Sequence, residues 1–509
     1  MKRALVLTLT AAAALGFCGR ALAGYTDLSV VSAHPGGRVF RGEDVYIVAE
    51  GFLPPQACSS KVDVWFSNLN HVKTDYGSYR PQFSEIFQGE IKVYVPNGIP
   101  ANAPYGAAAI WVKQKCGPNG GLSAQKWRRV TVVDRATALT PKYTSATTAD
   151  ALAGGKAVVK FNLSQDAWTP MNVQYELTPG QWVNVAAPAR FHYADAGANQ
   201  FSWAVPAGAP AGHYRFAMST VSYAADTGVN GWNESTANWT YAPFSVAQAL
   251  GAGTLASAGG AAINAAGSVV VADSGHHRLA RYRIDGVAEG AIAAGLTTPA
   301  DVAPAPDGGY FVADSGTGLI SRLDRLGTVI SRFGARGPGS GKFAAGPVGV
   351  ATTSTSVYSV DGANPFVSMF SLAGVFGTSF PGVPSTLTTP IDVAAGPDGS
   401  VYVVDGRRTT IAHFTATGSP LASVSLPSAR AGLITPRPTA IDVDSHGRLI
   451  VPDAGQKVVW VLDGKGRQLA RVGVGLLQVP SGVTAAGTAG DFYVVDRAAN
   501  RVLHFRVPA

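Results

Sequence analysis

The feature that most constrains the fold of this 509-residue chain is a repeat in its C-terminal half. Six stretches align without a gap, from "GSVVVADSGHHRLARY" (267–282) to "GDFYVVDRAANRVLHF" (490–505). Each ends its first apolar run on an aspartate, and these residues are Asp273, Asp314, Asp361, Asp405, Asp453 and Asp496. Their spacing of 41 to 48 residues indicates a repeat architecture rather than a single globular core.

Each repeat unit contains four short apolar segments that are joined by turns. A proline opens the first segment in five of the copies, as in "PADVA" from Pro299 and "PIDVA" from Pro390. A four-stranded sheet of this size cannot bury both of its faces alone, but sheets packed around an axis share them. Residues 248–509 are therefore predicted to form a six-bladed β-propeller. The last copy lacks a fourth strand, and we expect "GTLASAGG" (253–260) to supply it and close the ring.

The units resemble the NHL repeat. "PIDVAAGPDGSVYVVDGRRTTIAHF" and "PSGVTAAGTAGDFYVVDRAANRVLHF" are similar to its pattern of a proline, an apolar strand, a turn, a strand ending in Asp, a polar loop with Arg and another strand. The resemblance covers residues 253–509, about half of the chain, and the third and fifth copies depart from it at Pro365 and Pro452. It implies an NHL-type propeller.

The N-terminal half alternates short apolar segments with turn residues over 24–134 and again over 135–247. "GGKAVVKFNLS" in the second region parallels "GEDVYIVAEGF" in the first. Both regions resemble the immunoglobulin-like (IPT/TIG-type) modules of bacterial secreted proteins, which implies two tandem β-sandwiches and an all-β chain. The second region is rich in tryptophan, which favours a sandwich core, with an aromatic surface for sugars as the alternative. These residues are Trp168, Trp182, Trp203, Trp232 and Trp239.

Residues 1–23 are typical of a signal peptide, because basic residues precede an apolar stretch and an A-x-A sequence that ends at Ala23. Cys18 leaves lipidation as an alternative. We expect export to the periplasm or the cell exterior, and no later segment offers the roughly 20 apolar residues of a membrane span. Cleavage would lower the formal net charge from +8 to +5 by removing three basic residues.

Two cysteines would remain after cleavage, Cys58 and Cys116. In an oxidising compartment, an even pair within one predicted domain is expected to form a disulfide.

The six repeating aspartates are expected to be structural, because an Asp at a strand end can accept bonds from backbone N–H groups and fix the next turn. Asp301 and Asp392 differ, since each lies two residues after the opening proline on the innermost strand. Two carboxylates would therefore face the central channel, where a divalent cation or a small polar ligand could bind. No other cofactor is predicted. NHL-type amidating lyases hold zinc with channel histidines, whereas His276 and His277 are adjacent on one loop, so no metal ligand is assigned.

The loops after the second and fourth strands of each blade share one face of a propeller. They are predicted to gather basic side chains there: Arg336, Lys342, Arg407, Arg408, Arg430, Arg437, Lys457, Arg497 and Arg501. Such a face is either solvated charge or a surface that attracts an acidic protein or an anionic polysaccharide. Some NHL propellers bind RNA on this face, but export argues against a nucleic-acid partner.

The sequence thus favours a secreted, non-catalytic recognition or scaffold protein that binds a protein or an anionic polysaccharide through the propeller loops. One alternative is a propeller enzyme, a lyase or lactonase-type hydrolase with a metal near Asp301 and Asp392. Another is a structural component of a cell-surface or electron-transfer assembly. Propellers host many activities, so the fold does not choose among these.

Overall fold

The computed structural model describes the strands within residues 30–133 and most of residues 141–508. The gaps in the second range are residues 166, 190–192, 195, 224–231, 382–386, 428–434 and 488–489. The predicted leader, 1–23, and Arg430 lie outside the described residues. The described elements are strands, apart from two 3₁₀ turns, Ser274–His276 and Arg497–Ala499. Neither of these helical turns is long and apolar enough to cross a membrane.

The first region forms two sheets, β1-β3-β6 and β2-β8-β7-β4-β5. In the antiparallel pair β4–β7, Cys58 lies directly opposite Cys116. This register is compatible with the expected disulfide, and the bond itself stays a prediction. The strands are β1 (Val30–Val31), β2 (Arg38–Phe40), β3 (Asp44–Ala49), β4 (Cys58–Asn68), β5 (Gly77–Tyr79), β6 (Glu90–Tyr94), β7 (Ala108–Cys116) and β8 (Leu122–Val133).

The second region has a sheet β16-β11-β9 and a sheet β14-β13-β17-β18 whose inner faces share one core. In β11, alternate residues such as Val159 and Phe161 are buried, and they belong to the same core as Phe216 and Phe244 of the other sheet. The strands are β9 (Tyr143–Thr148), β10 (Ala151–Leu152), β11 (Lys156–Leu163), β12 (Ala167–Trp168), β13 (Met171–Thr178), β14 (Gln181–Ala189), β15 (Tyr193–Ala194), β16 (Gly197–Ala204), β17 (Gly212–Tyr223) and β18 (Trp232–Leu250).

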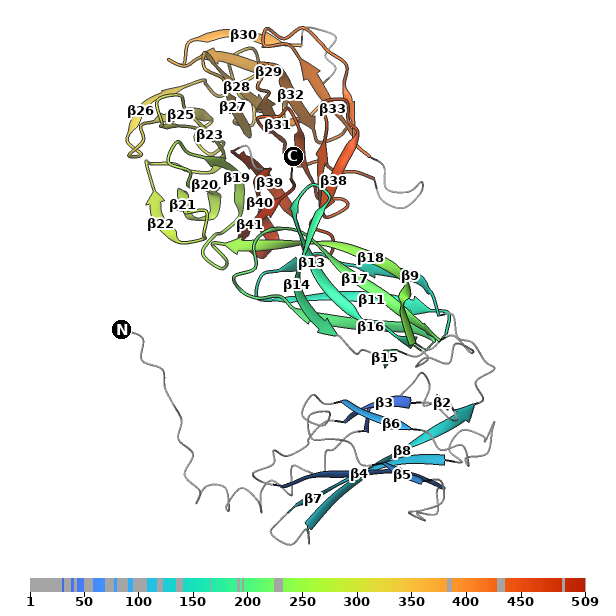
Figure 1. Ribbon diagram of the computed structural model, residues 1–509. Helices are drawn as coiled ribbons and strands as arrows, with labels where there is room; N and C mark the ends of the chain where they lie inside the picture. Colours follow the sequence, from blue (N-terminus) through green and yellow to red (C-terminus); the bar gives the residue numbers. More distant parts are fainter. Residues whose placement is uncertain are drawn as a thin grey trace, which may run out of the picture.

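The C-terminal half is a propeller of consecutive antiparallel sheets, each with its strands in chain order (Figure 1). The first strands of neighbouring sheets contact one another in the cycle β19, β23, β27, β31, β35, β39 and back to β19. The complete four-stranded sheets are β19 (Ala258–Ile263), β20 (Val269–Asp273), β21 (Arg278–Tyr282) and β22 (Ala288–Ile292); β23 (Pro299–Pro304), β24 (Tyr310–Asp314), β25 (Leu319–Leu323) and β26 (Val329–Phe333); β27 (Gly349–Thr352), β28 (Ser356–Asp361), β29 (Asn364–Ser371) and β30 (Phe376–Phe380); β31 (Pro390–Ala395), β32 (Val401–Asp405), β33 (Thr410–Phe414) and β34 (Val424–Ser425); and β35 (Asp442–Val443), β36 (Leu449–Asp453), β37 (Val458–Leu462) and β38 (Gln468–Val472).

Burial on both faces explains why the second strands are continuous apolar runs rather than alternating ones. All five residues of β20 are buried. Val271 belongs to the core shared with the last sheet, while Val270 belongs to the core shared with β24. Each sheet is therefore stabilised by both of its neighbours, at roughly 25 cal/mol for each Å² of apolar surface removed from water.

The last sheet contains β39 (Pro480–Ala486), β40 (Asp491–Asp496) and β41 (Arg501–Arg506), and its fourth strand is the end of β18. Gln248, Ala249 and Leu250 pair with β41. The expected closing segment, 253–260, is therefore wrong: it forms a turn and the start of β19. The closing strand lies a few residues earlier, because the long β18 extends directly from the sandwich into the ring.

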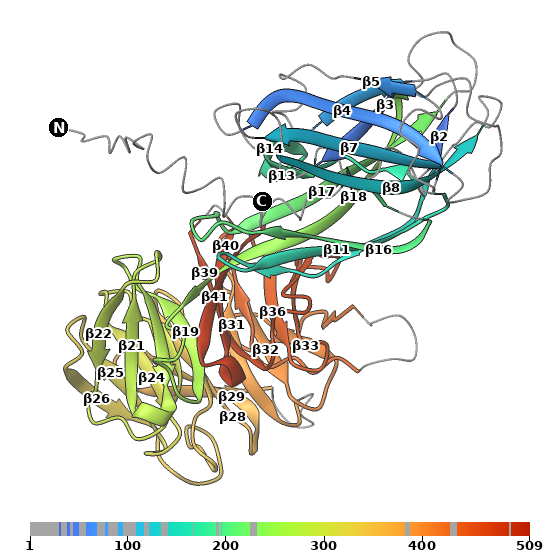
Figure 2. The ribbon, with the colours of Figure 1, turned by 90° about the horizontal axis from the view of Figure 1, so that it is seen from below.

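The second region lies against the side of the ring formed by β39–β41 (Figures 1 and 2). Because β18 pairs with β17 at one end and with β41 at the other, one continuous sheet joins the two regions. Asp150 reinforces this junction by accepting backbone N–H bonds from Ser245 of β18 and from Gly473 and Val474 of the propeller. Burial raises the pKa of Asp150 to about 6.

Ring closure by β18 predicts that Leu250→Ala will destabilise the propeller by about 2 to 5 kcal/mol, the usual cost of truncating a buried leucine. Leu250 is buried in a core with Tyr282 and Val502, which come from the first and last sheets. Urea unfolding measures the loss, and deuterium uptake should rise more in β41 than in β24. The control is Leu326→Ala, because Leu326 is 78% exposed. Equal effects of the two substitutions would contradict this account of closure.

Candidate functional site: the central channel and its mouth

The inner strands of the propeller enclose a channel of about 750 Å³. One end is surrounded by the loops that follow the second and fourth strands, and we call this end the mouth face. The turns that join the first to the second strand and the third to the fourth strand form the opposite face. Ser274, Thr298, Arg437, Ser481 and Arg497 line the channel toward its mouth.

The six repeating aspartates lie buried under the mouth face and anchor its loops. Each is almost completely buried and accepts backbone N–H bonds from a loop that reaches the same sheet. Asp314, for example, accepts from Thr297 at 2.9 Å and from Thr298 at 2.7 Å. Because both loops of each sheet meet at such an aspartate, their exposed side chains are held on one surface.

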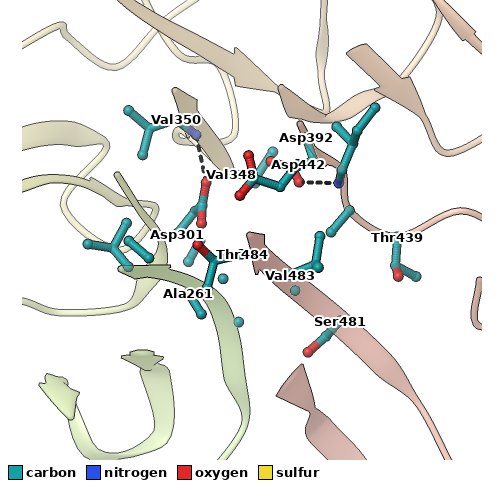
Figure 3. A pocket seen from close by; sticks show the side chains of 18 of the residues that line it. Ala261, Asp301, Val348, Val350, Asp392, Thr439, Asp442, Ser481, Val483 and Thr484 are labelled. Carbon is teal, nitrogen blue, oxygen red and sulfur yellow. Dashed lines mark hydrogen bonds between the residues drawn. The ribbon is translucent and has the colours of Figure 1, made fainter. Parts of the chain in front are cut away.

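Three carboxylates, rather than the two expected, lie in the channel (Figure 3). Asp301 comes from β23, Asp392 from β31 and Asp442 from β35. Asp442 was missed because alignment on the opening proline places Ala440, not Asp442, at the equivalent position. A signal was present in the sequence, since the dipeptide Asp-Val is shared by all three strands.

Each of these carboxylates accepts a backbone N–H bond from the inner segment of the next sheet around the ring. Asp301 accepts the backbone N–H of Val350 at 2.8 Å, and Asp392 accepts that of Ile441 at 2.8 Å (Figure 3). Asp442 accepts the N–H of Ala485 at 2.8 Å. Innermost strands have an unpaired edge toward the channel, so these carboxylates satisfy backbone donors that would otherwise lack a protein partner.

Glycines on adjacent inner strands make room for two of the carboxylates. A Cβ on Gly260 would lie 1.6 Å from Oδ1 of Asp301, and one on Gly349 would lie 2.8 Å from Oδ1 of Asp392. Side chains at these two positions are therefore excluded by the carboxylates. The alternation of Asp and Gly on neighbouring strands thus has a steric cause.

Confinement in the channel makes the three carboxylates weak acids. Loss of hydration raises the pKa of Asp301 to about 7 and that of Asp442 to about 6. The same desolvation, together with the charge of Asp301, raises the pKa of Asp392 well above its usual range. The amide bonds act in the other direction, because they favour the ionised form.

Asp301, Asp392 and Asp442 line the same channel, and the charge of Asp301 acts on Asp392. Within the part of the chain that the structure describes, no group of three or more His, Cys, Asp or Glu side chains is placed to hold a metal ion. The channel cation that the sequence left open at Asp301 and Asp392 stays a prediction.

The histidines of the repeat lie in packing positions. His413 stacks on Tyr402 with ring centroids 4.1 Å apart, and His504 stacks on Tyr493 at 4.7 Å. At the corresponding place in the second sheet, the guanidinium of Arg322 lies 4.6 Å from the ring centroid of Phe311. A flat cationic or imidazole group on the third strand thus covers an aromatic ring on the second.

The predicted basic residues divide into two groups. Arg336, Arg497 and Arg501 donate to backbone carbonyls of neighbouring loops, and Arg408 pairs with Asp405 at 3.6 Å. The others that the structure describes are exposed and make no side-chain hydrogen bond or ion pair within the described residues: Lys342, Arg407, Arg437 and Lys457.

The described mouth-face loops contain no Asp or Glu besides the six buried aspartates. Accessible carboxylates lie instead in turns of the opposite face: Asp285, Asp307, Asp324, Asp398 and Asp463. Among the described loops and turns of the propeller, accessible carboxylates are therefore confined to the opposite face, whereas accessible cations lie on both faces.

No protein-family model matches this sequence, and no curated protein sequence matches it. Several solved structures are similar in fold. Virginiamycin B lyase from Staphylococcus aureus has 14% identity and a TM-score of 0.37, covering 58% of this chain and 94% of its own. A gluconolactonase from Xanthomonas campestris has 17% identity and a TM-score of 0.40, covering 49% and 86%.

A nidogen/laminin complex structure has 15% identity and a TM-score of 0.38, covering 53% of this chain and 95% of its own. At these identities and TM-scores, none of the three assigns an activity or a partner to this chain. The propeller architecture rests on the strand order and the cyclic contacts of the inner strands.

We predict that Asp314→Ala will lower the free energy of unfolding by about 2 to 4 kcal/mol, because it leaves the N–H groups of Thr297 and Thr298 without their acceptor. Urea denaturation provides the measurement. Asp324→Ala is the matched control, since Asp324 bonds to backbone N–H groups in an exposed turn, and its effect should be much smaller. A similar loss in the two variants would argue against a structural role specific to the repeating aspartates.

Asp301→Asn should make the protein less sensitive to rising pH. The raised pKa means that the folded state holds the proton more tightly than the unfolded state, whose pKa is near 3.8. The stability from this group is therefore complete below about pH 4 and is lost as pH rises to about 7. Asparagine keeps an acceptor for Val350 and cannot ionise.

Thermal unfolding at pH 5 and pH 8 tests this expectation. The melting temperature of the variant relative to the wild type should be higher at pH 8 than at pH 5. In Asp324→Asn, whose carboxyl has a lowered pKa, the difference should not rise with pH. The account of the channel is contradicted if Asp301→Asn shows no such relative gain.

Proposed function

We propose that this protein is a secreted, non-catalytic recognition protein that binds an anionic partner through the mouth face. In this proposal, residues 248–509 are a six-bladed NHL-type propeller, and two immunoglobulin-like modules over 24–134 and 135–247 precede it. The single observation that carries the proposal is that the described mouth-face loops expose basic side chains and contain no accessible carboxylate. The signal peptide and the export that it implies are part of the proposal and rest on the sequence.

Electrostatic attraction is the physical basis of this binding. Arg407, Arg437 and Lys457 are exposed, and the described loops around them contain no accessible carboxylate to neutralise them. Their fields add over the face, so they attract an acidic protein or an anionic polysaccharide and orient it toward the channel. The loops that carry them donate backbone N–H bonds to the buried Asp405 and Asp453, and this anchoring limits the entropy lost on binding.

The channel itself favours binding over catalysis. Each of its three carboxylates already accepts a backbone N–H from the next sheet, so it helps to hold adjacent sheets of the ring together. A lyase or lactonase-type site at Asp301 and Asp392 would have to use the carboxylate lone pairs that these backbone N–H groups leave free. Titratable groups with raised pKa in a cavity are also found at enzyme sites, which keeps the enzyme as the second candidate.

Replacing Arg437 and Lys457 together by Gln should weaken binding to an anionic polymer at least ~10-fold at low salt. Affinity electrophoresis in gels that contain polygalacturonate or an acidic protein, with dextran as the neutral reference, measures the change. The matched control replaces Arg325 and Lys465, one exposed arginine and one exposed lysine on the opposite face.

Wild-type binding should also weaken as the salt concentration rises, because mobile ions screen exposed charges. Equal losses in the two double variants, or binding that is insensitive to salt, would contradict recognition by the mouth face. Metal analysis of the purified protein tests the second candidate. A stoichiometric divalent ion that disappears when Asp301 and Asp392 are both replaced by Ala would favour the enzyme.

A further inference from the structure

The sandwich that adjoins the propeller has an outer sheet face that does not contribute to its core. Along β17, Tyr214, Phe216 and Met218 point into the core, so Arg215 between them points outward. Along β18, Ala242 and Phe244 belong to the core, which places Tyr241 and Trp239 on the outer face. The tryptophans thus divide, since Trp203 lies in the core and Trp239 does not.

Arg215 is held between two aromatic rings on this face. Its guanidinium carbon lies 4.1 Å from the ring centroid of Trp182 and 3.9 Å from that of Tyr241. The rings come from β14 and β18, the two strands that flank β13 and β17 in this sheet. Nε of Arg215 also donates to Oε1 of Gln174 at 2.6 Å. These three contacts fix the plane of the guanidinium group.

No carboxylate among the described residues forms an ion pair with Arg215. Glu176, on the same strand as Gln174, is already engaged by His213 at 3.0 Å and by the backbone N–H of Gly180 at 2.7 Å. The terminal NH₂ groups of Arg215 make no hydrogen bond within the described part of the chain. A planar fork with its Nε occupied and its terminal nitrogens free matches the two oxygens of a carboxylate.

The surroundings of Arg215 suit a sugar more than a simple anion. Trp239 is 49% exposed and Tyr241 is 47% exposed, and they lie about 7 Å apart along one strand. Large rings with one exposed face can stack against the apolar C–H face of a sugar ring. Nε2 of Gln174 donates to Oδ1 of Asn184 at 2.9 Å. Asn184 is exposed, so its side-chain NH₂ group can donate to a sugar hydroxyl.

We propose that this aromatic–arginine face, formed by Trp182, Arg215, Trp239 and Tyr241, binds an acidic polysaccharide that contains uronate residues. The uronate carboxylate bonds to the terminal nitrogens of Arg215, while a sugar ring stacks on Trp239 or Tyr241. Charge complementarity selects the acidic polymer, because the cation on this face lacks an ion-pair partner among the described residues. The proposal does not rest on the mouth face, since the two surfaces share no residue.

Isothermal titration of the full-length protein with polygalacturonate and alginate oligosaccharides tests the proposal, with neutral galactan as reference. Arg215→Gln should lower affinity for the acidic oligosaccharides at least ~10-fold, the loss expected for a charged bidentate hydrogen bond. Trp239→Ala should lower it to a similar degree. Arg215→Lys should bind more weakly than the wild type, because a lysine keeps the charge but lacks the planar fork.

Two substitutions serve as matched controls. Arg471→Gln removes another exposed arginine beside a tryptophan, where the guanidinium carbon is 5.4 Å from the ring centroid of Trp460. Leu177→Ala removes another exposed apolar side chain, 57% exposed, from the same sandwich. Both should keep the wild-type affinity within about twofold, the usual range for surface positions remote from the site. Unchanged melting temperatures show that the variants are folded.

Four results would overturn the proposal: no binding of either acidic oligosaccharide by the wild type, equally tight binding of neutral galactan, unchanged affinity in Arg215→Gln, or equal losses in the controls. The mouth-face double variant separates the two proposals. If the charges at Arg437 and Lys457 alone control binding, the mouth face holds the polymer and the aromatic–arginine face does not.

Discussion

The propeller depends on the burial of each thin sheet between its two neighbours. The second strands, such as β20, have no exposed residue, and the valines on their two sides belong to different cores. Apolar burial of this kind is complete only when the cycle is closed. The closing strand is the end of β18, which also belongs to the sandwich, so ring stability and the attachment of the sandwich have a common origin.

The channel illustrates how a ring uses polar groups that a single sheet would not need. Inner strands leave backbone N–H groups facing the axis, and three aspartates satisfy some of them across sheet boundaries. These carboxylates lose hydration and become weak acids as a result. Their perturbed acidity thus has a structural cause, which weakens the usual inference from a perturbed pKa to catalysis.

The two proposed binding surfaces rely on different physics. The mouth face gathers exposed cations without accessible carboxylates, so its attraction acts over several ångströms and is weakened by salt. The aromatic–arginine face fixes a single guanidinium between rings, so it acts at contact distance through geometry. Together they would combine long-range attraction of an acidic polymer with local recognition of its sugars.

The sequence by itself determined the all-β propeller, because a 41 to 48 residue period of apolar runs ending in aspartate permits little else. It also identified Asp301 and Asp392 on inner strands. The tertiary structure decided which segment closes the ring, since Gln248–Leu250 and 253–260 are both adjacent to the first sheet in sequence. It added Asp442, which pairs with Ile450 and so lies two residues further along its inner strand than Asp301 and Asp392 lie along theirs. It alone placed Arg215 between Trp182 and Tyr241, because those residues are far apart along the chain and meet across four strands.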